Sequence, residues 1–161
     1  MKYSNREFDT TGMLLAKMQA EMFSDATKRG FGSYYFLRRF ASSTYCKALD
    51  SLAILRSSLV PDNFWDENEK TISKNGTIFH SDVMHWIGYI YRYWCYVENI
   101  KMMKLIQRVP IKYLASIYNA YHSLSPEVVV AHVKETLHIN EEERRKKVIE
   151  KFRKIYLASI L

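Results

Sequence analysis

The chain has 161 residues, of which 48% are hydrophobic and 14% aromatic, and its formal net charge is +7. This length and composition are typical of one folded domain and exclude an intrinsically disordered chain. Five Gly and three Pro are too few for a turn-rich β-sandwich. We expect residues 1–161 to form a single all-α domain.

Two features indicate a cytoplasmic protein. The opening residues, MKYSNREFDTT, lack the apolar segment of a secretion signal. The two cysteines, Cys46 and Cys95, form no C-x-x-C motif and both fall in predicted helices. Reduced thiols in a cytoplasmic chain are the expectation.

Two helices are predicted in the first third of the chain. The first runs from about Phe8 to Lys28 and ends before Gly30. The second begins at Ser33 and continues without a break to about residue 55, because apolar and small residues recur there at helical spacing. Its adjacent Arg38 and Arg39 point to one side, where they are either solvated or ion-paired within the fold, or else contact a partner.

Residues 59–80 are the least helical part of the sequence. An acidic, turn-forming segment, VPDNFWDENE, contains Phe64 and Trp65, which either pack back onto the core or contact a partner. Asn75-Gly76 then lies between two short alternating runs, and this pattern predicts a small β-hairpin near 71–79.

Residues 81–100, SDVMHWIGYIYRYWCYVENI, predict the central buried helix, over about 82–98, with Ser81 as its N-cap. Roughly 15 apolar residues, interrupted by charge, are too few to span a bilayer. His85, Arg92 and Asn99 repeat every seven residues and form a narrow polar strip. The strip is either a site for an anionic group of a partner or a buried arginine satisfied within the fold.

Two short helices follow, over about 101–108 and from Pro110 onward. Together, residues 100–122 have the spacing of a helix-turn-helix unit, which favours DNA binding as an alternative function. The second of these helices carries Lys112 outward but has no arginine to read guanine.

The last third of the chain predicts two more helices, one after Ser125-Pro126 and one capped by Asn140. The final helix is rich in basic residues, including Arg145, Lys147 and Lys151. Its apolar stripe, beginning at Val148, is expected to dock against the domain or a partner. The expected total is six or seven helices.

No motif for catalysis or for metal or nucleotide binding is present. None of the five histidines stands four residues from another, and no glycine-rich phosphate loop or G-x-S-x-G sequence occurs. We therefore predict no catalytic residue, no metal ligand and no cofactor. An enzyme without a recognisable motif is the least favoured reading.

Three segments carry a resemblance to a known group of proteins: SYYFLRRF (33–40), HWIGYIYRYW (85–94) and YHSL (121–124). They resemble segments of small, uncharacterised bacterial all-helical proteins encoded in toxin–antitoxin-like gene clusters, sometimes near ADP-ribosyltransferase-like toxins. The resemblance covers about residues 30–135 and implies an antitoxin or accessory role, with a toxin as the protein partner. Its motifs are packing motifs and assign no catalytic residue.

The first hypothesis is therefore a non-enzymatic protein-binding module, and the alternative is a DNA-binding regulator. Neither predicts contact with a membrane. Residues proposed to contact the partner are Phe64, Trp65, His85, Arg92, Asn99, Arg38, Arg39, Arg145, Lys147 and Lys151.

Overall fold

The computed structural model describes residues 5–139 and 141–160, and across these residues the chain is α-helical without a strand. The predicted cap Asn140 lies outside the described residues. In chain order the elements are α1 (Thr10–Lys28), α2 (Ser33–Ser42), α3 (Thr44–Asp50), η1 (Ala53–Arg56), α4 (Pro61–Asn68), η2 (Glu69–Thr71), α5 (Ser81–Glu98), α6 (Met102–Arg108), α7 (Ile111–Tyr121), α8 (Pro126–Thr136) and α9 (Glu141–Ile160).

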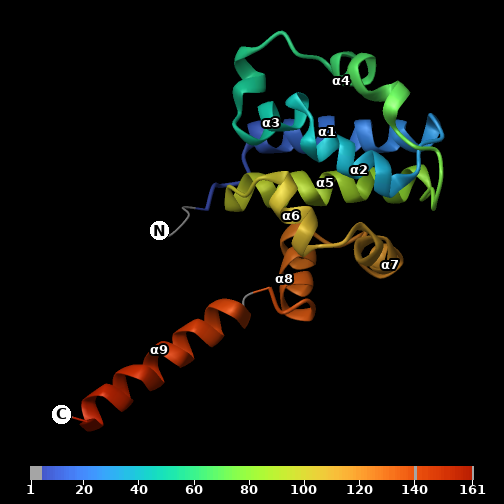
Figure 1. Ribbon diagram of the computed structural model, residues 1–161. Helices are drawn as coiled ribbons and strands as arrows, with labels where there is room; N and C mark the ends of the chain where they lie inside the picture. Colours follow the sequence, from blue (N-terminus) through green and yellow to red (C-terminus); the bar gives the residue numbers. More distant parts are fainter. Residues whose placement is uncertain (1–4, 140, 161) are drawn as a thin grey trace.

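Helix α5 runs through the middle of the fold, as predicted. Helices α1 to α4 lie on one side of it, and α7 and α8 lie on the other (Figure 1). It packs against α1, α6, α7 and α8. Its aromatic rows supply much of the core, since Tyr91 and Trp94 are among the largest fully buried side chains.

The N-cap of α5 differs from the predicted one, whereas the helix ends where it was expected to end. His80, not Ser81, is the N-cap, because its side chain accepts a hydrogen bond from the Asp82 backbone N–H. Asn99 ends the helix in the left-handed conformation at φ 53°, which asparagine tolerates better than most residues.

The predicted single helix over 33–55 is wrong, because it breaks at Ser43. Ser43 takes an extended conformation and its hydroxyl accepts a hydrogen bond from the Cys46 N–H, starting α3. The same hydroxyl donates to the Phe40 carbonyl at the end of α2. Serine favours such caps over helix interiors, and the break adds a helix to the expected number.

The segment predicted to be turn-forming, VPDNFWDENE, is mostly the helix α4. Pro61 occupies its first turn, and the Asn63 side chain accepts a hydrogen bond from the Val60 N–H. A proline at this position fixes a helical φ and loses no intrahelical bond. The acidic residues therefore lie on a short helix instead of a loop.

The predicted hairpin over 71–79 does not form. Gly76 does make a turn with φ +80°, but the two arms bond to the α1–α2 junction instead of to each other. Gly32 N–H donates to the Ser73 carbonyl, and Ser33 N–H donates to the Thr77 carbonyl. Tertiary hydrogen bonds have satisfied the backbone groups that a hairpin would have paired.

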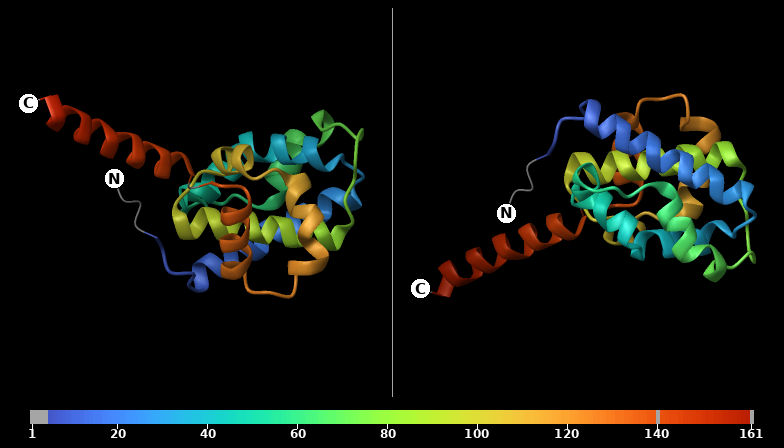
Figure 2. Two further views of the ribbon diagram at one scale, coloured as in Figure 1. Left: turned by 90° about the horizontal axis from the view of Figure 1, so that it is seen from below. Right: turned by 90° about the horizontal axis from the view of Figure 1, so that it is seen from above.

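Helix α9 extends away from the rest of the molecule (Figures 1 and 2). All its described side chains, 145–160, are exposed. Docking of its apolar stripe against the domain, one of the two expected possibilities, is not seen. Among the described helices, none is both long and apolar enough to cross a membrane.

Candidate protein-binding surface

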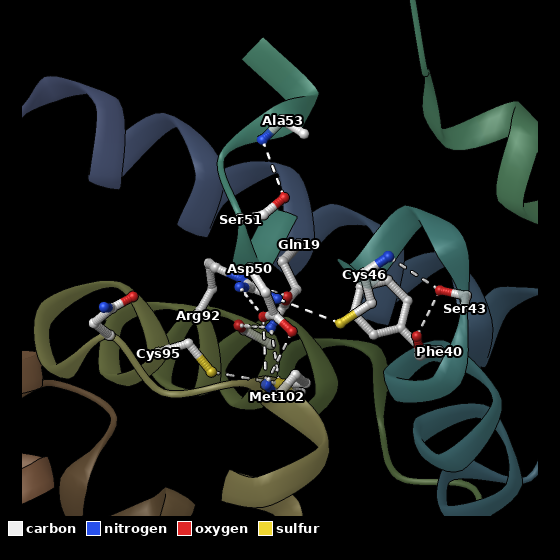
Figure 3. A network of polar contacts seen from close by, with 12 residues as sticks. Gln19, Phe40, Ser43, Cys46, Asp50, Ser51, Ala53, Arg92, Cys95 and Met102 are labelled. Atoms are coloured by element: carbon white, nitrogen blue, oxygen red, sulfur yellow. Dashed lines mark hydrogen bonds and ion pairs between the residues drawn. The ribbon is translucent and has the colours of Figure 1, made fainter. Parts of the chain in front are cut away.

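Arg92, the centre of the predicted polar strip, lies in the core. Its side chain is 1% exposed, and its Nη1 donates to Asp50 Oδ1 of α3 at 2.7 Å. Its Nε donates to Gln19 Oε1 of α1 at 2.8 Å, and Nη2 lies 3.5 Å from Cys46 Sγ (Figure 3). Arg92 is thus satisfied within the fold and is not available to a partner.

The charge of Arg92 is retained despite its burial. Burial alone would lower the pKa of the guanidinium. The bonded Asp50 carboxylate favours the charged form, and the pKa of Arg92 lies above its ordinary value. The group is a permanent buried cation that ties α1 and α3 to α5.

The other two members of the strip have separate roles. The His85 ring nitrogen Nε2 lies 3.3 Å from Glu21 Oε1 at the surface. Asn99 Oδ1 accepts a hydrogen bond from Arg6 at 2.8 Å and so ties the N-terminal segment to the end of α5. The three residues do not form one continuous site.

Phe64 and Trp65 pack back onto the core, the first of the two alternatives. They are 1% and 2% exposed. Trp65 stacks on Phe31 and Phe36, and the Arg29 guanidinium lies 4.2 Å from the Trp65 ring. Neither aromatic side chain is available to a partner in this structure.

Arg38 and Arg39 remain exposed, and the reason is the spacing of α2. Its buried side chains include Phe36, Leu37 and Phe40. At 3.6 residues per turn this leaves the alternate pairs, Tyr34 with Tyr35 and Arg38 with Arg39, on the outer face. The two arginines therefore project from the body beside two exposed tyrosines.

Two neighbouring hollows meet at this face, and we call them together the α2–α6 groove. The larger has a volume of about 620 Å³ and the smaller about 340 Å³, and Arg38 and Met103 line both. The larger is lined by Tyr34, Leu37, Arg38, Met103, Ile106, Gln107, Pro110, Ile111 and Lys112. Arg39 lines the smaller. The floor is largely apolar and the charges at its edges are positive.

The exposed tyrosines are the residues that sequence reasoning missed. Tyr34 and Tyr35 are 54% and 44% exposed, and the Arg38 guanidinium lies 5.8 Å from the Tyr34 ring. The signal was present, because Tyr34 and Arg38 stand four residues apart on the face opposite the buried phenylalanines. Met103 has no such signal, since it arrives from a helix distant in sequence.

The other predicted basic residues, Arg145, Lys147 and Lys151, lie on α9. All three are exposed. Helices α7 and α8 lie between α6 and α9 in the sequence, and α9 projects away from the body (Figure 1). The accessible basic candidates other than His85 thus fall on two surfaces, the groove and α9, whereas His85 and Asn99 are accessible at separate places along α5 and contact Glu21 and Arg6.

Comparison of the chain with protein-family models, with curated proteins and with solved structures gives no match.

Proposed function

We propose that this chain is a non-catalytic protein-binding module that holds an acidic segment of a partner protein in the α2–α6 groove. The observation that carries the proposal is the groove itself. Its exposed Tyr34, Arg38 and Met103 surround an apolar floor. Tyrosine, arginine and methionine are enriched where protein interfaces concentrate their binding energy.

The charge of the groove selects the partner. The described residues that line its two hollows include Arg38, Arg39 and Lys112 and no Asp or Glu. Opposite charge across an interface speeds association and excludes partners of like charge. The partner segment should therefore carry apolar side chains for the floor and carboxylates for the rim.

The resemblance to proteins of toxin–antitoxin-like clusters supports a specific version of this proposal. In that version the partner is a toxin encoded by a neighbouring gene, and binding neutralises it. The α2 segment SYYFLRRF carries part of the resemblance and also supplies the groove's tyrosines and arginines.

The test is a comparison of three full-length proteins. The wild type, the Tyr34→Ala/Arg38→Ala variant and the Arg56→Ala control are used to capture partners from the native host. Any stoichiometric protein found, or the neighbouring gene's product, is then purified and titrated by calorimetry. We expect the groove variant to bind at least tenfold more weakly, a change equal to about 1.4 kcal/mol.

Arg56→Ala is the matched control because Arg56 is also exposed but lies on η1, and it lines neither hollow. It should bind as the wild type does. Equal binding by the groove variant, or no stoichiometric partner in any preparation, would contradict the proposal.

A DNA-binding regulator is the second candidate, favoured by one observation. Helices α6 and α7 form the two-helix unit anticipated from the sequence, and Arg38 and Lys112 share a hollow beside it. Such cations suit phosphate contacts. The described outer face of α7 nevertheless carries Lys112, Ser116 and Asn119 as its polar residues, a weak set for reading bases.

A salt titration on random duplex DNA distinguishes the two candidates. A phosphate-tracking protein loses affinity steeply between about 50 and 200 mM salt. We expect no binding to the duplex even at the low end. Binding whose affinity falls steeply with salt, with a smaller slope in the Lys112→Ala variant, would favour the DNA-binding regulator.

A further inference from the structure

Helix α9 presents a second exposed surface, and none of its residues lines the α2–α6 groove. Its described side chains are all exposed, and its large apolar residues are between 52% and 67% exposed. From Arg145 to Ile160 it has six basic residues and one acidic residue, a net charge of +5. Large apolar side chains exposed together on one helix are typical of a surface that a partner covers.

The first half of the apolar surface is a stripe. Val148, Ile149 and Phe152 lie within an arc of about 100° at 100° per residue. Lysines, arginines and Glu150, which is ion-paired with Lys154, occupy the rest of the circumference there. This half alone would suit any flat apolar surface.

The second half has no polar side. Residues 155–160, IYLASI, contain no charged side chain, and successive residues point in every direction around the axis. Leu157 lies about 130° from the middle of the stripe at helical pitch. Its side chain is 52% exposed. The Ser159 hydroxyl donates a hydrogen bond to the Tyr156 carbonyl, so its proton needs no acceptor on a partner protein.

A surface that covers one side of the helix would leave Leu157 in water. This argues against a flat bilayer surface and against a single facing helix. A second copy of α9 is further disfavoured because each copy, with seven basic and four acidic residues over 141–160, carries a net charge of +3. The stripe from Val148 to Ile160 also spans fewer than three heptads, short for a coiled coil.

We infer that α9 inserts into an enclosing apolar groove of a partner protein, with carboxylates at the mouth of the groove. The groove walls would surround residues 155–160. The carboxylates would face Lys151, Arg153 and Lys154, which lie one turn before the uncharged segment. This is the helix-in-groove mode of recognition, with basic flanking residues.

The experiment uses the full chain and calmodulin loaded with Ca²⁺ as a defined acidic protein with grooves that enclose apolar helices. Titration is followed by calorimetry. Ca²⁺ removal by chelator closes those grooves and serves as the first control. We expect saturable binding that the chelator abolishes.

The decisive variants are Leu157→Gln and Phe152→Gln. Glutamine has a helix propensity close to that of leucine, and the α9 side chains support no other element. Both variants should bind calmodulin at least tenfold more weakly, and Phe152→Met should bind as the wild type does. Leu55→Gln, an equally exposed leucine on η1, should have no effect.

Several results would overturn the inference. One is absence of binding to Ca²⁺-loaded calmodulin, and another is full binding by Leu157→Gln. A third is binding to vesicles of phosphatidylcholine and phosphatidylserine in a 3:1 ratio without binding to calmodulin, which would make the occupant a lipid surface. A fourth is dimerisation in sedimentation equilibrium that Phe152→Gln removes. None of these variants touches the α2–α6 groove, so this result and the test of the proposed function are independent.

Discussion

Arg92 and Asp50 form a buried ion pair, with Nη1 and Oδ1 2.7 Å apart and side chains 1% and 11% exposed. The Asp50 carboxylate also accepts the backbone N–H of Met102 at the start of α6, at 3.2 Å. One carboxylate thus joins α3 to both α5 and α6. Removing it leaves a cation without a counter-charge inside the fold.

We expect Asp50→Ala to lower the free energy of unfolding by about 3–5 kcal/mol, the usual cost of breaking a buried pair. Urea denaturation followed by far-UV circular dichroism measures the change. Asp66→Ala removes an exposed carboxylate on α4 and should stay within about 0.5 kcal/mol of the wild type. A loss below about 1 kcal/mol for Asp50→Ala would show that water reaches Arg92.

Gly88 lies at a point of close approach between α1 and α5. A Cβ atom there would lie 2.8 Å from the Phe23 ring and 3.0 Å from the Gln19 carbonyl oxygen. In an exposed helix, Gly→Ala stabilises by about 1 kcal/mol. Here overpacking should outweigh that gain, so we expect Gly88→Ala to destabilise by about 1–2 kcal/mol.

Chemical denaturation of Gly88→Ala is compared with that of Ala120→Gly on the exposed face of α7. The second variant measures the propensity difference without packing and should cost about 1 kcal/mol. Stabilisation by Gly88→Ala would mean that the two helices separate without cost.

Asp9 gives the fold a pH dependence. Hydrogen bonds from the Gly12 N–H at 3.0 Å and from the Tyr96 hydroxyl at 2.7 Å lower the pKa of Asp9 below its ordinary value of 3.8. A carboxylate whose pKa is lower in the folded than in the unfolded protein stabilises the fold fully at pH values above its unfolded-state pKa. That contribution is lost as the pH falls through its folded-state pKa.

The midpoint of thermal unfolding, Tm, should therefore fall more steeply for the wild type than for Asp9→Asn from about pH 5 to pH 2.5. Asparagine keeps the acceptor oxygen but does not titrate in this range. Scanning calorimetry at several pH values checks this. Parallel Tm curves for the two proteins would exclude a stabilising role for the charge.

The two cysteines should be unreactive in the native protein. Both are buried, and burial raises the pKa of Cys46 and raises that of Cys95 to about 12. Only the thiolate attacks disulfide reagents. We expect no labelling by an aromatic disulfide at pH 8 in native buffer and full labelling of two thiols in urea.

The Cys46→Ala and Cys95→Ala variants identify which thiol reacts. Labelling of either thiol in native buffer as fast as in urea would show that the core around Arg92 opens without global unfolding.

The sequence predicted the elements whose signal is local. The aromatic rows of α5 predicted that helix, and the N-cap and proline at the start of α8 predicted α8. The pattern over residues 101–122 predicted α6 and α7. Ser43 was not predicted as a break, because a serine in a helical pattern is compatible with either a helix interior or a cap. The failure at Asn75-Gly76 has a different cause: the turn is local, but its flanks pair with Gly32 and Ser33.

The candidate site residues also divide into those whose environment follows from local spacing and those whose environment depends on residues distant in the sequence. The exposure of Arg38 and Arg39 follows from the spacing of α2 alone. The burial of Arg92 depends on Asp50 and Gln19, which are 42 and 73 residues away and have no pattern linking them to it. Long-range pairing of this kind leaves no trace in a single sequence.

The separation of α9 from the body has a consequence for cooperativity. A lone helix of 20 residues is marginally stable in water, whereas the other helices share a core. Amide hydrogens of α9 should thus exchange with solvent within seconds, long before those of α5. Binding of a partner to α9 would then slow amide hydrogen exchange in α9 alone and leave the exchange rates of the other helices unchanged.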